Sequence, residues 1–452
     1  MLFRALIWLY TSSMTSRDQF RGKRVAVIGL GPHGEMVEDA KFLIKAGALV
    51  SIYDLRSEAR LKAHLIALRT AGLANYVCGS IPPDDLLDMD MVILSHEYPS
   101  DSSFLAPVYA AGIPVEYAET LFFKLLPPVT IVGVMGPAGT STVVSMLSPM
   151  IEAVCEANDG QGFFIVDQES DNGALAHLKK VKSGDIVLVR LTAHMMKELH
   201  ALRMSPQVAV FTGIPPTGSY TASPFEILSF QTYNNFIIAD DSVIDATYAF
   251  KFQTKAKMIR TKASFLPTDW SVNGRGPHDR ANAALALQTA KLFKVSDEMA
   301  HDMLEAWSPE KGRLEPVKKV RGVEYYNDSA SVSPLSTLTA IDVLAQGKNA
   351  VLIFGGISGN AEYKALYATL PAHVHTLILL PGSGTLKERR NIQMLEGVVI
   401  HSAPSVEEAV RIASEKAQKG DRVIFSPGFE AGGMDRSRKE RGERFVRAVR
   451  AL

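Results

Sequence analysis

Residues 129–142 read VTIVGVMGPAGTST, and this stretch decides how the middle of the chain folds. Its first half, Val129–Val134, is a continuous apolar run of the kind that forms a buried parallel strand. Its second half has the outline of a phosphate-binding loop, formed by Gly136, Gly139, Thr140, Ser141 and Thr142. The glycines of such a loop let backbone N–H groups surround a phosphate, and a hydroxyl of the last two residues can bind Mg²⁺. Thr140 stands where a lysine normally contacts the phosphates, so the loop is predicted to lack its main cation.

A similar unit lies nearer the N-terminus. The apolar run Arg24–Ile28 is followed by a helical stretch and by a second strand, Leu49–Tyr53, which ends at Asp54. The glycines between strand and helix are in GxGxxG register: Gly29, Gly31 and Gly34. This arrangement brings backbone close to a diphosphate at the positive end of a helix, yet many doubly wound domains carry such glycines only for a tight turn. From these residues alone the two interpretations are equally good.

The alternation of apolar strands and helical segments continues to the C-terminus without an internal repeat. It predicts an α/β fold of three consecutive domains, which are Rossmann-like at the N-terminus, P-loop-type in the centre and Rossmann-like at the C-terminus. The expected boundaries are an N-terminal extension at 1–21 and domains at 22–128, 129–308 and 309–452, with Trp307–Arg313 as a linker. Further strands are expected at 91–94, 113–115, 185–189, 208–211, 236–239, 323–326, 350–354, 376–380 and 422–425, and a helix at 281–293.

Composition limits the classes of protein that the chain can belong to. Of its 452 residues, 47% are hydrophobic and 21% charged, which excludes a disordered chain. Its 48 basic and 48 acidic residues balance, so charge gives no reason to expect nucleic acid as a partner. Cys78 and Cys155 have no metal-site spacing, and a reducing, cytoplasmic location is expected. The apolar start MLFRALIWLY is too short to span a bilayer, so no transmembrane segment is predicted, and Met14 is an alternative first residue.

Several ordered motifs together resemble the Mur ligases, most closely the branch that adds D-glutamate. They are VAVIGLGPHG, AGIPVEYAETLFFKLL leading into VTIVGVMGPAGTST, EYYNDSASVSP and SPGFEAGGMDRSRKERGERF, which follow the family's order and spacing over nearly the whole chain. The resemblance implies ATP-dependent amide formation through an acyl-phosphate in peptidoglycan precursor synthesis, with ATP and Mg²⁺ as cofactors. It implies UDP-N-acetylmuramoyl-L-alanine and D-glutamate as small-molecule substrates, and a monomer.

The resemblance also assigns binding residues. It implies a site for the UDP-linked substrate at Gly29, Gly31, Gly34, Asp54 and Arg56. It implies an ATP site at the loop residues Gly136, Gly139, Thr140, Ser141 and Thr142, with Arg313 and Asp328 framing the adenine and ribose.

The chain departs from the family at the residues that carry the chemistry. Arg190 stands in place of a glutamate that binds Mg²⁺, and Thr217 and Gly218 replace an Asp-His pair that supplies a second ligand. Between Glu198 and Phe250 there is no lysine to be carbamylated, and Ala330 replaces a substrate-binding lysine. Because Mg²⁺ prefers carboxylate and water oxygens, no metal ligand is predicted and catalytic residues stay unassigned. ATP and Mg²⁺ are expected as cofactors only if the protein is an active ligase.

Other side chains that could replace the missing metal ligands or catalytic groups have simpler interpretations. The acids Glu169, Asp171, Asp240 and Asp241 are expected to cap helices rather than bind metal. His194 is expected to be a packing residue rather than an acid or base. The arginine row Arg438, Arg441, Arg444, Arg447 and Arg450 is expected to be a solvated helix face rather than a binding stripe.

Three functions remain for comparison. The first is a ligase with impaired or altered catalysis. The second is a non-catalytic relative that binds a UDP-sugar precursor or a partner ligase. The third, a nicotinamide dehydrogenase, explains only the first glycine-rich loop and ranks last.

Overall fold

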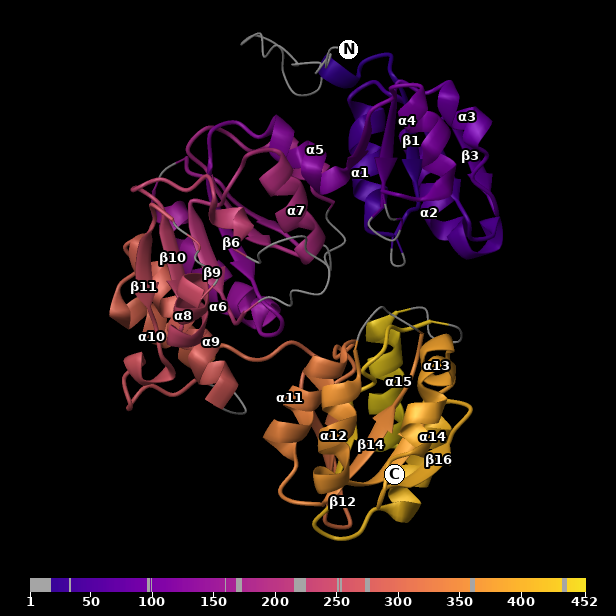
Figure 1. Ribbon diagram of the computed structural model, residues 1–452, viewed down its shortest axis with the longest axis vertical. Coiled ribbons are helices and arrows are strands. Elements are labelled where there is room, and N and C mark those ends of the chain that lie inside the picture. Colours follow the sequence, from indigo (N-terminus) through magenta and orange to yellow (C-terminus); the bar gives the residue numbers. More distant parts are fainter. Residues whose placement is uncertain are drawn as a thin grey trace.

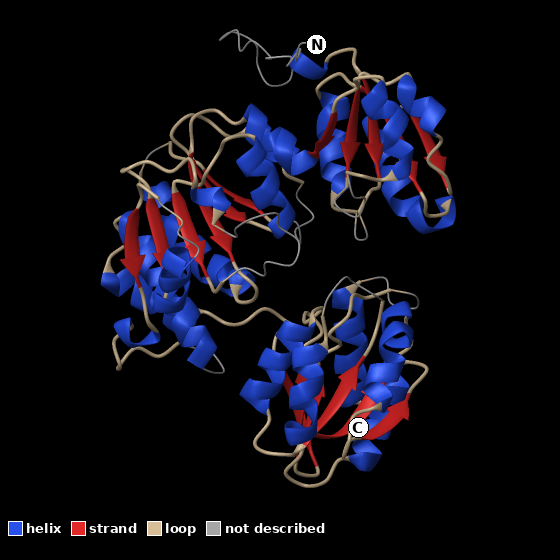
Figure 2. Cartoon of the chain, in the orientation of Figure 1, coloured by secondary structure: helices blue, strands red, loops and turns tan. Residues whose placement is uncertain are grey.

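The chain is described here from a computed structural model. The structure describes residues 18–31, 34–95, 98, 100–158, 160–167, 173–214, 225–249, 252, 254–272, 277–357, 362–432 and 437–452. The predictions for Met14, Glu169, Asp171, Thr217 and Gly218 fall outside these residues. Figure 1 shows three α/β bodies in chain order, and Figure 2 shows that each consists of strands flanked by helices. The predicted fold class is confirmed, whereas the exact domain boundaries stay predictions.

The first body is a parallel sheet of the doubly wound type. Its strands are β1 (Arg24–Ile28), β2 (Leu49–Asp54), β3 (Asn75–Cys78), β4 (Met91–Leu94) and β5 (Val115–Tyr117), in the order β3-β2-β1-β4-β5. Its helices are α1 (Met36–Lys45), α2 (Glu58–Ala71), α3 (Pro83–Leu87), α4 (Ala106–Ala110) and α5 (Ala118–Leu125). The strand order reverses between β1 and β4, which is where ligands bind in open α/β sheets.

The second body carries the loop that opened the sequence. Its parallel strands are β6 (Thr130–Met135), β7 (Phe163–Val166), β8 (Ile186–Arg190), β9 (Val208–Phe211), β10 (Phe236–Ala239) and β11 (Lys257–Arg260), in the order β11-β10-β9-β6-β8-β7. Its helices are α6 (Thr140–Ala157), α7 (Ala193–Ala201), α8 (Asp241–Ala249), α9 (Pro277–Leu292) and α10 (Asp297–Ala306). The apolar strand β6 is central, so the loop that follows it lies between neighbouring strands β8 and β9.

The third body contains the only antiparallel pairing among the described strands. Its strands are β12 (Glu315–Val320), β13 (Val323–Asn327), β14 (Ala350–Phe354), β15 (Val374–Leu379), β16 (Val399–Ser402) and β17 (Arg422–Phe425), in the order β12-β13-β17-β14-β15-β16. Its helices are α11 (Pro334–Leu344), α12 (Lys364–His373), α13 (Ser383–Gln393), α14 (Val406–Lys416) and α15 (Arg438–Arg450). Strand β12 pairs antiparallel with β13 at the edge, which extends the otherwise parallel sheet.

The first and second bodies share apolar packing, and one polar contact fixes it. A single cluster of buried side chains contains Phe42 of α1 and Leu175, which begins the 3-10 helix Leu175–Lys179 of the second body. The backbone N–H of Leu175 donates to Oδ1 of Asp39 at 2.7 Å. In the part of the chain that the structure describes, no helix combines the length and apolar character that a membrane crossing requires.

One strand and one surface differ from expectation. The strand expected at 113–115 lies at Val115–Tyr117, because Pro114 contributes a carbonyl to the neighbouring Val92 but has no N–H of its own. The arginine row of α15 is not a uniformly solvated face. Arg441 is 1% exposed and donates to the carbonyl of Phe429, while Arg444 forms an ion pair with Glu407.

Candidate functional site

The phosphate-type loop connects β6 to α6 and is fixed by its neighbour β9. Gly136 has φ 145°, and a Cβ atom there would lie 2.2 Å from Oγ1 of Thr212. That hydroxyl donates to the carbonyl of Ala138 at 2.6 Å, so the loop is held where only glycine fits. Helix α6 begins at Thr140, and its N-terminal N–H groups carry the partial positive charge that favours anions.

A cavity of about 750 Å³ opens at this loop, between the second and third bodies. Its wall includes six of the seven residues predicted to bind ATP: Gly139, Thr140, Ser141, Thr142, Arg313 and Asp328. Gly136 is not part of the wall. The fold therefore brings together residues from two bodies that are more than 170 positions apart in the chain.

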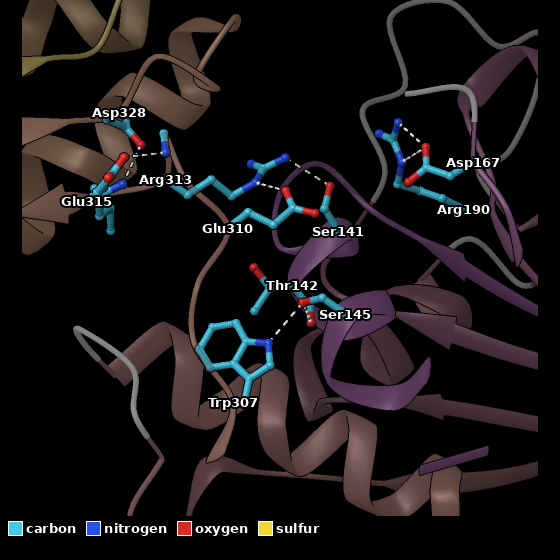
Figure 3. Close-up of polar contacts among 12 residues, drawn as sticks. Ser141, Thr142, Ser145, Asp167, Arg190, Trp307, Glu310, Arg313, Glu315 and Asp328 are labelled. Carbon is cyan, nitrogen blue, oxygen red and sulfur yellow. Dashed lines mark hydrogen bonds and ion pairs between the residues drawn. The ribbon is translucent and has the colours of Figure 1, made fainter. Parts of the chain in front are cut away.

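Arg313 connects the linker to the loop (Figure 3). Its Nη2 donates to Oγ of Ser141 at 3.0 Å, and its Nε donates to Oε2 of Glu310 at 3.2 Å. The sequence interpretation places this arginine at the adenine and ribose. In the structure the guanidinium lies against the loop that would hold the phosphates.

Asp328 is 3% exposed and belongs to the internal hydrogen bonding of the third body. Its Oδ1 accepts from the backbone N–H of Leu314 at 3.1 Å, and its Oδ2 accepts from the hydroxyl of Ser426 at 2.7 Å. Burial raises the pKa of Asp328 to about 6, although these hydrogen bonds oppose the shift. Because Leu314 follows Arg313, the carboxylate fixes the backbone that carries the guanidinium.

Two contacts at the cavity involve residues that sequence reasoning did not select. The indole Nε1–H of Trp307 donates to Oγ of Ser145 on α6 at 3.1 Å, which attaches the linker to the helix that follows the loop (Figure 3). Asp167, directly after β7, accepts from Nε and Nη2 of Arg190 at 2.7 and 2.6 Å. An acid that follows a buried strand was the only available signal for Asp167, and nothing in the sequence pointed from Trp307 to Ser145.

The described residues around the loop do not offer Mg²⁺ a set of carboxylates. The acids in the cavity wall are Asp240, Asp241, Asp279, Glu310 and Asp328. Glu310 forms an ion pair with Arg313, and Asp240 caps α8 through the N–H of Val243 at 3.0 Å. Asp241 forms ion pairs with Lys262 and Arg260, whose hydrogen bonds lower its pKa. Among the residues that the structure describes, no three His, Cys, Asp or Glu side chains cluster as metal ligands do. The donors present therefore do not fit a magnesium site, and no reaction step is assigned to one.

The first glycine-rich loop is organised around a buried ion pair. Asp54 has no exposed surface, and its carboxylate accepts from the N–H of Leu30 at 3.0 Å and from Nε of Arg56 at 2.8 Å. Burial alone would raise the pKa of Asp54, but these hydrogen bonds outweigh it and lower the pKa. Nη1 of Arg56 donates to the carbonyl of Gly31 at 2.7 Å. Asp54 thus holds Arg56 against the loop.

The remaining glycines of this loop have the backbone conformation that their spacing suggests. Gly29, Gly31 and Gly34 have φ values of 78°, 77° and 89°. A Cβ atom at Gly34 would lie 2.7 Å from Nε2 of His64, so the turn packs closely on α2. These residues lie at the carboxyl end of β1, next to the reversal of strand order.

His194 and Ala330 complete the predicted positions. The ring of His194 packs edge-on against Tyr117 with centroids 4.1 Å apart, which agrees with a packing role. Ala330 lies in the cavity wall, where its backbone N–H donates to the carbonyl of Gly312 at 2.9 Å. Its methyl group offers no charge to a substrate at this position.

Comparisons with known proteins agree with the motifs. Residues 312–429 match the family described as Mur ligase, glutamate ligase domain. The chain is 28% identical over 475 aligned positions to a UDP-N-acetylmuramoylalanine–D-glutamate ligase from Roseiflexus sp. (strain RS-1), covering 96% of this chain and 100% of that relative. The comparisons therefore support the resemblance that the motifs indicate, over residues 312–429 through the family match and over nearly the whole chain through this relative.

Solved structures share the fold. A murein peptide ligase from Psychrobacter arcticus aligns with a TM-score of 0.61 at 14% identity, covering 95% of this chain and 99% of that one. The MurF ligase from Thermotoga maritima, solved in complex with ADP, aligns with a TM-score of 0.55 at 14% identity over 97% of each chain. Both relatives have the three-body α/β arrangement described above.

Proposed function

We propose that this chain, a member of the Mur ligase family, joins D-glutamate to UDP-N-acetylmuramoyl-L-alanine at the expense of ATP, with catalysis altered from that of its relatives. The name of the Roseiflexus relative is that of a ligase for these two substrates. The reaction would serve peptidoglycan precursor synthesis, as the resemblance of the motifs implies. The observation that carries the proposal is the cavity between the second and third bodies, in which the phosphate-type loop meets Arg313.

The residues of the chain suit nucleotide binding in this cavity. The N-terminus of α6 and the glycine-rich loop favour a polyphosphate, and the guanidinium of Arg313 adds a charge beside Ser141. The relative from Thermotoga maritima was solved with ADP, which supports a nucleotide as the occupant. The UDP-linked substrate is assigned to the loop of Gly31 and Gly34, at the carboxyl end of β1, with Arg56 beside it.

The altered catalysis follows from three side chains. In this reaction a carboxylate of the substrate takes the γ-phosphoryl group, and charge on the transferred group must be stabilised. Thr140 supplies no ammonium for it, Arg190 places a cation where the family has a carboxylate, and Ala330 removes a contact to substrate. We therefore expect turnover well below that of a relative with the full set.

A second candidate function is favoured by the Arg190–Asp167 ion pair. The two opposite charges of this pair balance at the carboxyl ends of β7 and β8. Such a site suits a protein that binds nucleotide and UDP-sugar without catalysing a reaction between them. Such a protein would act as a sensor or as a partner of an intact ligase.

The test is ADP release by the purified protein with ATP, Mg²⁺, UDP-N-acetylmuramoyl-L-alanine and D-glutamate, each omitted in turn. The Roseiflexus relative, assayed in parallel, is the positive control. Release that needs every component supports the ligase. No release, together with protection of the protein from thermal unfolding by the UDP-linked substrate, supports the binding protein. Absence of both release and protection contradicts both functions.

A further inference from the structure

The phosphate-type loop needs positive charge that Thr140 does not supply, so another cation of the cavity has to provide it. Four lysine and arginine side chains among the described residues line the cavity: Arg190, Lys262, Arg313 and Arg438. They differ in the element that carries them and in the partners that hold them.

Three of the four are poorly suited to replace the lysine. Lys262 is 54% exposed and forms an ion pair with Asp241 at 2.7 Å. Arg313 lies on the linker and Arg438 on α15, so both belong to segments outside the sheet that carries the loop. The distance of these two guanidinium groups from a bound phosphate therefore depends on the position of the third body.

Arg190 differs because it is built into the same sheet as the loop. It is the last residue of β8 and lies in register with Val134 of β6, two positions before the loop begins at Gly136. The next residue, Leu191, donates its N–H to the carbonyl of Val134 at 2.9 Å. The side chain is only 14% exposed, so its charge is weakly screened by water.

We propose that the Arg190 guanidinium is the phosphate-binding cation of this loop and lets the cavity bind a nucleoside polyphosphate without a divalent metal. The inference rests on the proposed nucleotide cavity and names the group that neutralises the phosphates there. A guanidinium has five N–H donors in a planar fork, and Asp167 accepts from its Nε and Nη2. Asp167 is a positioning residue, because it orients the guanidinium from the neighbouring strand β7.

The same charge works against a metal. The guanidinium stands at the end of β8 where a metal ligand would be needed, and its N–H groups suit phosphate oxygens rather than Mg²⁺. Asp240 and Asp241 on the same cavity wall are engaged by the start of α8 and by Lys262 and Arg260. In this chain the guanidinium of Arg190 thus takes the place of a bound metal. Binding of nucleotide should then be insensitive to chelation.

The experiment measures ADP and ATP affinity by isothermal titration calorimetry, in excess EDTA and again in Mg²⁺. The variants are Arg190→Gln, Arg190→Lys and Asp167→Asn, with Lys197→Gln as a control that removes an exposed charge from α7. We expect the wild type to bind in EDTA, with affinity that Mg²⁺ changes less than about threefold. Arg190→Gln should weaken binding about 10- to 100-fold, the effect of one charged hydrogen-bonding contact. Arg190→Lys should recover part of the loss, because it restores charge without the planar fork.

Asp167→Asn should tighten binding, because it removes the negative charge beside the guanidinium while keeping the shape of the side chain. Arg190→Gln leaves a partly buried carboxylate without its cation, so thermal unfolding is measured for each variant. The double change Arg190→Gln with Asp167→Asn restores charge balance, and it should still bind nucleotide weakly.

The outcomes separate this inference from the proposed function. Wild-type binding that requires Mg²⁺, or equal binding by wild type, Arg190→Gln and the double variant, overturns the role of Arg190 and leaves the cavity a nucleotide site. Metal-independent binding that Arg190→Gln abolishes supports the inference even when no ADP is released in the ligase assay. No binding by the wild type under any condition overturns both.

Discussion

Replacing Asp39 by asparagine should stabilise the protein at neutral pH. Asp39 is 3% exposed at the junction of the first and second bodies, and its Oδ1 accepts from the N–H of Leu175. It shares a small acidic space with Glu35, Glu119 and Asp167. Burial, and then the charge of Glu119, raise the pKa of Asp39 to about 8. An asparagine amide has the same shape and can accept the same hydrogen bond, and it needs no proton to be neutral.

The direction in which stability changes with pH follows from proton binding by Asp39. The folded protein holds the Asp39 proton more tightly than the unfolded chain, whose carboxyl titrates near pH 4. The free energy of unfolding therefore falls as the pH rises from about 4 to about 8, and it levels off above that. Because a tenfold change in proton affinity corresponds to about 1.4 kcal/mol, the proton that Asp39 must take up on folding at pH 7 costs up to about 4 kcal/mol. We expect Asp39→Asn to recover about 2–4 kcal/mol at pH 7 and little at pH 4.

The measurement is urea unfolding of wild type and variant between pH 4.5 and 8.5. Glu38→Gln is the matched control, since Glu38 is the neighbouring acid, 41% exposed and paired with Lys41. That control should change stability by less than about 0.5 kcal/mol. Parallel pH profiles for wild type and Asp39→Asn, or a variant less stable than wild type at pH 7, would refute the reasoning.

Three further changes test the cavity. Thr140→Lys should tighten ADP binding about 10-fold in calorimetry, whereas the rate of ADP release should stay low because the other altered residues remain. Full ligase activity would contradict the role given to Arg190. Arg313→Ala should weaken ADP binding about 10-fold, with Ser141→Ala as the control for the lost hydrogen bond, and unchanged affinity would remove Arg313 from the site. Trp307→Phe should lower the free energy of unfolding, measured with urea, by about 1 kcal/mol. An aromatic ring stays at this position, but the indole N–H that donates to Ser145 is lost. An unchanged free energy of unfolding would show that this hydrogen bond is unimportant.

Central strands were predictable, and five of the six edge strands were not. The strands β1, β9, β10, β14 and β17 lie at the positions expected, because strands covered on both faces read as continuous apolar runs. The strands β3 (NYVC), β7 (FFIV), β11 (KMIR), β12 (EPVKKV) and β16 (VIHS) were missed. All five are sheet edges, and most carry polar or charged residues that no periodic apolar pattern marks.

For the candidate site, local motifs could be predicted but their partners could not. The glycines of both loops follow from backbone geometry, which a short stretch of sequence records. The contacts of Arg313 with Ser141 and of Trp307 with Ser145 join positions 172 and 162 residues apart, so only folding brings them together. Asp167 meets Arg190 because β7 and β8 are neighbours, and β7 itself was not predicted.

The contact of Trp307 with Ser145 makes intrinsic tryptophan fluorescence a probe of the junction between the linker and α6. The chain has three tryptophans, and Trp307 is 9% exposed at the point where the linker leaves the second body. Emission from a buried indole shifts to longer wavelength when water reaches it. Any movement of the third body that pulls the linker from α6 would thus change the colour of intrinsic fluorescence. In a background with Trp8→Phe and Trp270→Phe, Trp307 is the single emitter, and such a movement can be followed in real time on unlabelled protein as nucleotide is added.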